Sequence, residues 1–127
     1  MKRDMDLVRK ILIKLEDYSP DDEINQIECE GYSPEETAYH VYLLKDAHLI
    51  IANIFMNNNS IGPKEYKIYG LTWAGHDFLE ASRDETRWKQ AKEVVIKMGS
   101  GASFDVLKSV LVQIMMAQIP KIIGTGV

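Results

Sequence analysis

The stretch over residues 33–50 constrains the fold of this chain most, because it combines a strong helix start with a turn into a strand. Ser33 can cap the first free backbone N–H groups, Pro34 stands where a missing donor costs nothing, and Glu36 completes a capping box. An apolar run over 49–56 follows directly behind residues that recur at helical spacing, namely Ala38, Val41, Leu44 and Ala47. The sequence therefore predicts a helix with a tight exit into a strand.

Three further segments have helical patterns. Apolar residues predict an amphipathic helix over about 4–16, with Asp4 and Asp6 near its positive end. Thr72 is expected to cap a third helix, and Asp84 could cap another, so one bent helix and two consecutive helices both remain open. The buried side of this region is expected to carry Trp73, Phe78, Leu79 and Ser82.

Residues 49–56 and 65–71 are rich in branched and aromatic side chains, and residues 57–63 between them have turn-forming chemistry. This pattern predicts a β-hairpin with a long tip. Helix, tight exit and hairpin is the order in which a winged helix places its recognition helix ahead of its wing. We therefore predict an α+β, winged-helix-like fold with a helix, a short strand, a recognition-type helix, a β-hairpin wing and C-terminal helices.

The length suits one domain over 1–127, with a winged-helix-like core at 1–81, a helical extension at 82–119 and a tail at 120–127. The last helix is expected to start at Ser103 and Phe104, to end at Pro120, and to be apolar on nearly all sides. One interpretation packs this helix across the domain's own core. The other is a homodimer through it, because one small domain seldom has enough other surface to cover such a helix.

The interval over residues 21–36 has the sharpest charge asymmetry in the chain, with seven acids and no base. An ordinary winged helix has its second helix here, but Gly31 and the β-branched residues do not support one. Ile24, Ile27 and Cys29 indicate only a short strand, which we expect to replace that helix. The seven acids are Asp21, Asp22, Glu23, Glu28, Glu30, Glu35 and Glu36.

The net charge of −4 and the pI near 5.3 give no global attraction to nucleic acid or an anionic membrane, so such binding needs a local basic patch. The single cysteine, Cys29, excludes a disulfide within the chain and is expected to be a small apolar side chain. The N-terminus has no signal-peptide pattern, and no run reaches the length of a membrane span. We expect a soluble cytoplasmic protein with no membrane partner.

Catalytic and metal-binding motifs are absent from the sequence. His40 is expected to be a polar residue at the core edge, and His48 lies at the helix exit, where a cation favours the negative end. His76 is expected in the first turn of the third helix, where its ring could tuck under the wing. The partners that a catalytic or zinc site needs are not supplied by this spacing, so we expect no enzyme, no cofactor and no metal.

Residues 40–50, HVYLLKDAHLI, and 71–79, LTWAGHDFL, resemble winged-helix regulators of the ArsR, MarR and PadR kind. More closely, MKRDMDLVRKIL at 1–12, Tyr39-His40, 71–79 and Arg83-Asp84 resemble a bacterial and prophage family known as domain of unknown function 2513. That resemblance spans nearly the whole chain and implies a phage-associated setting, a winged-helix-like fold and no established activity. Both kinds usually have glycine at the position of His48, so a left-handed turn is expected on a side chain there.

The first functional hypothesis is a DNA-binding transcriptional regulator of helix-turn-helix type, with the helix at 33–47 in the major groove and the wing on the backbone. Electrostatics argue against this hypothesis, because Glu35 and Glu36 stand at the helix start that would approach the negatively charged duplex. The residues expected to contact double-stranded DNA are Thr37, Tyr39, Tyr42 and Lys45 from the helix, and Asn58, Asn59, Lys64 and Lys67 from the wing.

The second hypothesis is a non-enzymatic protein-interaction module, in which the acidic face at 21–36 binds a basic host or phage protein. The bland alternative is that these acids only solvate a loop and one helix end. The two hypotheses differ in the charge of the residues on which binding depends. DNA binding would depend on Lys64 and Lys67, whereas protein binding would depend on the seven acids.

Overall fold

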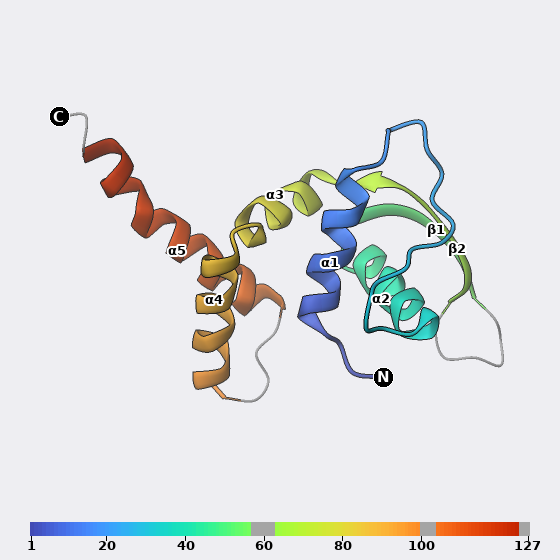
Figure 1. Ribbon diagram of the computed structural model, residues 1–127, viewed down its shortest axis with the longest axis horizontal. Helices are drawn as coiled ribbons and strands as arrows, with labels where there is room; N and C mark the ends of the chain where they lie inside the picture. Colours follow the sequence, from blue (N-terminus) through green and yellow to red (C-terminus); the bar gives the residue numbers. More distant parts are fainter. Residues whose placement is uncertain (57–62, 100–103, 125–127) are drawn as a thin grey trace. The chain divides into compact units, whose positions relative to one another are not determined.

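The computed structural model is described here over residues 1–56, 63–99 and 104–124, apart from the side chains of 63, 64 and 121–124 (Figure 1). Over these residues it is an α+β structure with five helices and one two-stranded antiparallel sheet. The elements are α1 (Met5–Glu16), α2 (Pro34–Asp46), β1 (Ile50–Met56), β2 (Pro63–Leu71), α3 (Trp73–Ser82), α4 (Glu85–Lys97) and α5 (Phe104–Gly124). Internal contacts divide the chain into two compact units, Met1–Asp77 and Phe78–Val127. The predicted boundary at residue 81 and the single-domain organisation stay predictions.

Helix α2 begins as its sequence predicts. The Ser33 hydroxyl accepts the N–H of Glu36 at 3.1 Å, and the Glu36 carboxylate accepts the N–H of Ser33 at 3.1 Å, so the capping box is complete. At the other end His48 has φ 61°, which confirms the left-handed turn expected on a side chain. Helix α1 likewise begins behind an N-cap, Asp4, whose carboxylate accepts the N–H groups of Asp6 and Leu7.

The hairpin curves over α2 within the first unit (Figure 1). Strands β1 and β2 pair in antiparallel register from Ile50 opposite Leu71 to Met56 opposite Pro63, with irregularities at Ile51/Ala52 and Phe55/Met56. The core of this unit joins the apolar face of α1 to α2 and to the inner face of the sheet. Its fully buried members include Leu7, Ile11, Leu12, Val41, Leu44 and Ile68. The predicted hairpin is confirmed, whereas its tip over 57–62 lies outside the described residues.

The start of α3 is fixed against the start of β1. Thr72 caps the helix by accepting the N–H of Gly75 at 3.0 Å, as predicted, and its hydroxyl donates to the carbonyl of His48 at 2.7 Å. A Cβ on Gly75 would lie 2.0 Å from the carbonyl oxygen of Leu49, so only glycine allows this close approach. Trp73, expected on the buried side, is 85% exposed because the first turn of α3 directs it away from this contact.

Helices α3 and α4 are separate, and the Asp84 side chain caps α4 by accepting the N–H of Arg87 at 2.8 Å. The ring of Phe78 packs against the rings of Trp88 and Phe104. Helix α5 continues through Pro120 to Gly124, so the expectation that Pro120 ends it is wrong. Proline removes one hydrogen bond, but its φ near −65° is compatible with a helix that continues.

Helix α5 is fully buried only at positions in its first half, although Met115 is still half-buried and Gln118 accepts a hydrogen bond from Arg87. Leu107 and Leu111 are buried, whereas Val112, Met116 and Ile119 are exposed. Beyond Leu111 the described apolar residues of α5 are half-buried or exposed, so the rest of the domain covers this helix only in part, and a homodimer through α5 stays a proposal. Among the described residues, no helix is both long and apolar enough to cross a membrane.

Candidate functional site

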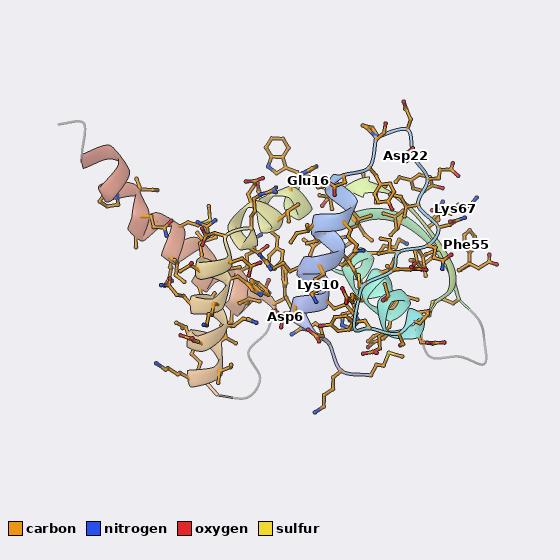
Figure 2. The ribbon with its side chains drawn as sticks, viewed as in Figure 1. Asp6, Lys10, Glu16, Asp22, Phe55 and Lys67 are labelled. Carbon is orange, nitrogen blue, oxygen red and sulfur yellow. The ribbon has the colours of Figure 1, made fainter. Side chains whose placement is uncertain are left out.

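The acidic surface consists of the seven carboxylates over residues 21–36, and it lies on the first unit. The described segment between α1 and α2 forms no helix, as expected, and the short predicted strand is reduced to one bridge between Ile24 and Ile68. Six carboxylates are exposed, and the seventh, Glu36, is half-buried in the capping box of α2. Asp22 and Lys67 are labelled on this side of the unit in Figure 2.

Three hydrogen bonds hold the segment under the acids against β2. The N–H of Ile24 donates to the carbonyl of Ile68 at 2.9 Å, and the N–H of Ile68 donates back to Ile24 at 2.8 Å. The N–H of Ile27 donates to the hydroxyl of Tyr66 at 2.9 Å. The side chains of Ile24, Ile27 and Cys29 are buried, which leaves Glu23, Glu28 and Glu30 directed to solvent.

Burial changes the titration of two groups beneath the acidic surface. It raises the pKa of the Tyr66 hydroxyl, and it raises the pKa of the Cys29 thiol, which nearby Lys14 and Lys10 lower to a smaller extent. A thiol with a raised pKa holds less of the reactive thiolate at neutral pH. Cys29 is thus the small buried side chain that the sequence predicts.

A groove of about 660 Å³ lies beside the acidic surface, between residues 25–32 and the start of α2. Glu28 and Glu30 belong to its lining, together with the buried hydroxyl residue Thr37 and one base, Lys14. The charged groups of the groove are thus two carboxylates and one amine, and an extended basic segment could be held beside the carboxylates.

The helix residues expected to contact DNA do not form one exposed surface. Thr37, expected to contact DNA from the surface of the helix, is buried, and its hydroxyl donates to the carbonyl of Ser33 at 3.0 Å within the first turn of α2. Tyr39 and Tyr42 are half-buried, with their rings stacked at 6.3 Å between centroids. Lys45 alone of the four is fully exposed.

The wing residues expected to hold phosphates give little support. Lys67 is exposed, but its amine lies 4.0 Å from the carboxylate of Glu23, so it belongs to the margin of the acidic surface. Asn58 and Asn59 lie outside the described residues, as does the side chain of Lys64. An exposed ion pair of this kind contributes little stability, but it lowers the positive potential that a phosphate would meet.

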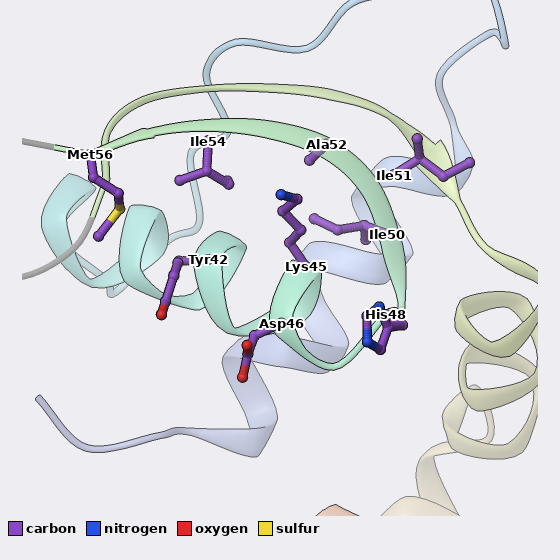
Figure 3. Close-up of a pocket in the computed structure, with 9 residues that line it drawn as sticks. All are labelled: Tyr42, Lys45, Asp46, His48, Ile50, Ile51, Ala52, Ile54 and Met56. Atoms are coloured by element: carbon purple, nitrogen blue, oxygen red, sulfur yellow. The ribbon is translucent and has the colours of Figure 1, made fainter.

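A second groove, of about 570 Å³, runs between α2 and β1 (Figure 3). Tyr42, Lys45 and Asp46 of α2 line one side, and the other side is lined by five residues of β1, namely Ile50, Ile51, Ala52, Ile54 and Met56. Figure 3 shows Lys45 directed toward β1, while Tyr42 and Asp46 point away from the sheet. The sequence analysis did not identify this groove; its available signal was that β1, IIANIFM, has no charged residue.

The three histidines serve different parts of the fold. His40 was expected at the core edge but is 1% exposed: its Nε2 accepts the N–H of Asp4 at 2.8 Å, and its Nδ1 donates to the carbonyl of Glu36 at 2.7 Å. Both bonds require the neutral ring with the proton on Nδ1. His48 and His76 are exposed, so His76 does not tuck under the hairpin. Within the described ranges, no three His, Cys, Asp or Glu side chains gather as metal ligands.

Asp4 also accepts a hydrogen bond from the hydroxyl of Tyr32 at 3.0 Å. Burial, and then this bond to a carboxylate, raise the pKa of Tyr32 to about 12. The amine of Lys10 lies 5.2 Å from the centre of the same ring. These contacts fasten the end of the acidic segment to α1, and they give Tyr32 a structural role.

Comparison with known proteins places the chain among sequences without an assigned activity. A family model described as "Hypothetical protein (DUF2513)" matches residues 2–102. A protein of Haemophilus influenzae described as "Uncharacterized protein" is 33% identical over 117 residues, which cover 87% of this chain and 92% of that relative. No solved structure matches.

Proposed function

The chain belongs to the DUF2513 family, described only as hypothetical proteins, and from its surface we propose that it is a non-enzymatic protein-interaction module. The proposed frame is winged-helix-like, and the proposed partner is a basic protein of the host or of a phage. The observation that carries the proposal is the acidic surface, where six of seven carboxylates are exposed and the segment beneath them is anchored by the buried side chains of Ile24, Ile27 and Cys29.

The fixed backbone favours recognition over simple solvation. Ile24 and Ile27 are hydrogen-bonded to β2, so the neighbouring carboxylates are held before a partner arrives and less conformational entropy is lost on binding. A basic side chain could enter the adjacent groove at 25–32 and would be partly shielded from bulk water there. Electrostatic attraction from several acids would also speed the encounter with a basic partner.

The test is to capture partners from cells of the source organism, purify the best candidate and measure its dissociation constant by calorimetry. Glu28→Gln with Glu30→Gln should weaken binding at least about 10-fold, because both acids belong to the groove and the acidic surface. Asp77→Asn with Glu93→Gln is the matched control, since it removes two other exposed carboxylates, and should change binding less than about 2-fold. Equal effects of the two pairs would contradict the proposal.

A second candidate is the DNA-binding regulator, favoured by the exposed Lys45 on a helix that runs directly into a hairpin. Fluorescence anisotropy of the protein against fragments of its own genome, at several salt concentrations, tests it. DNA binding would weaken by ~0.9 log units per log unit of salt for each phosphate neutralised, and Lys45→Glu would reduce it. Flat traces at low salt would remove this candidate. We also propose a prophage-associated setting, which the resemblance implies, and a cytoplasmic location, which fits the single cysteine.

A further inference from the structure

The free edge of the hairpin is the side of β1 that faces away from β2. We propose that it pairs with β1 of a second copy of this chain, in antiparallel orientation about a twofold axis at Asn53. The result would be one continuous sheet across two molecules, a form of strand addition. This inference is independent of the acidic surface.

The hydrogen bonds of β2 show which backbone groups of β1 point outward. Ile68 directs both its N–H and its carbonyl to Ile24, away from β1. Ala52 lies opposite Ile68, so this pair is not hydrogen-bonded, and the N–H and carbonyl of Ala52 point away from β2. The direction alternates along a strand, so Ile54 also presents its groups outward, as do Ile50 and Met56 at the two ends.

Nothing in the described part of the chain pairs with this edge. The backbone hydrogen bonds made outside the helices and the hairpin include none to residues 50–56. The groove along β1 leaves the space beside these groups open. Proteins usually protect such an edge with a charge, a proline or a short strand, and the seven residues of β1 contain no charge and no proline.

The strand is complementary to itself. With the axis at Asn53, Ala52 of one copy lies opposite Ile54 of the other, and Ile50 lies opposite Met56. These are the residues whose backbone groups point outward, so the whole strand can pair without a register shift. Within the paired strands no like charges meet, because β1 has no charged residue.

The exposed apolar residues of β1 fit the same register. Ile51 is 55% exposed and Phe55 is 49% exposed, and Figure 2 shows Phe55 directed outward from the hairpin. In the proposed dimer each Ile51 would lie opposite the Phe55 of the other copy, and a β-branched residue opposite an aromatic one is a favourable cross-strand pair. Ile51 and Phe55, which are exposed in the single molecule, would therefore be buried against each other in the dimer.

Cysteine crosslinking tests the register. In a Cys29→Ala background, Asn53→Cys should give a disulfide-linked dimer on oxidation, because residues at the axis form a pair with Cα atoms about 4.5 Å apart. Phe55→Cys is the matched control: its two copies would lie four strand positions, about 14 Å, out of alignment and should not crosslink. Crosslinking of Phe55→Cys as readily as Asn53→Cys would overturn the proposal.

Charge reversal gives a second test by sedimentation over a range of protein concentrations. Ile51→Lys with Phe55→Lys puts like charges opposite each other twice, whereas Ile51→Glu with Phe55→Lys puts opposite charges there and removes the same apolar residues. The first pair should have a dimer dissociation constant at least ~10-fold higher than the second. A wild-type monomer at all concentrations, equal constants for the two pairs, or loss of the dimer only on Met116→Lys in α5 would each overturn the proposal.

Discussion

The two edges of the hairpin are treated in opposite ways. On the edge of β2, Ile24 pairs with Ile68 through two backbone hydrogen bonds, and the hydroxyl of Tyr66 accepts a third from Ile27. On the edge of β1, the outward groups of Ala52 and Ile54 face a groove. The segment between α1 and α2 therefore covers the edge of β2 as a third strand would, although it forms only one bridge. In the described residues this irregular segment covers the edge of β2 and leaves the edge of β1 free.

The largest expected effect is a difference in unfolding free energy between substitutions on the covered edge, at β2, and on the free edge, at β1. Ile24→Ala should lower the free energy of unfolding by about 3 kcal/mol, because it empties a buried site on the covered edge. Ile51→Ala, on the free edge, should change it by less than ~0.5 kcal/mol in the monomer, since this side chain is already exposed. Urea denaturation followed by circular dichroism, at a concentration where the protein is monomeric, measures both. Similar losses in the two variants would break the comparison.

Tyr66→Phe should have an intermediate effect, a loss of about 1–2 kcal/mol. The substitution keeps the ring but leaves the N–H of Ile27 without its acceptor in a buried position. Denaturation in urea gives the value, and Tyr69→Phe serves as the control because its hydroxyl bonds only the exposed side chain of Asn53 among the described contacts. An equal loss in both variants would show that the Tyr66 bond does not secure the covered edge.

The same bond predicts how stability changes in alkaline solution. The pKa of Tyr66 is raised in the folded state above its ordinary value of 10.0, so the neutral hydroxyl is favoured by folding. Its contribution is fully present below pH 10.0 and is lost as the pH rises through the raised folded-state value. The unfolding free energy of wild type should therefore fall as the pH rises from 10.0 through the raised folded-state pKa, and that of Tyr66→Phe should fall less steeply over the same range.

The smallest expected effect lies where the free edge begins. His48 carries a φ of 61°, which strains a residue with a Cβ, so His48→Gly should raise the unfolding free energy by about 0.5–1 kcal/mol. The thermal midpoint measures it. A decrease would mean that the imidazole makes a contribution larger than the strain that it imposes.

Local chemistry was enough to predict the parts of the fold that depend on near neighbours. The capping box of Ser33 and Glu36, the cap at Thr72 and the left-handed turn at His48 each involve residues within a few positions of one another. Thr37 and Trp73 were assigned the wrong exposure, because burial of a helix residue depends on which elements surround it. The periodicity within a helix shows which residues share one face, but it does not show whether that face is buried or exposed.

For the candidate site as well, features that depend on near neighbours in sequence were predictable, and features that depend on distant segments were not. The acidic surface was readable because its seven carboxylates are close in sequence. The groove along β1 was not, because an edge is free only when no other segment reaches it, and that is a property of the whole chain. Lys67 shows the same limit: its neighbour Glu23 is 44 positions earlier, and their proximity follows from the bridge between Ile24 and Ile68.

The hydrogen bond from Asp4 to His40 has a consequence for how the N-terminus opens. Backbone amides this close to a chain end usually exchange their hydrogen with water freely, because the end frays. The amide of Asp4 instead donates to a buried ring 36 residues away. Its exchange therefore requires the bond between the start of α1 and α2 to break, so one amide at the fourth residue reports the opening of that contact.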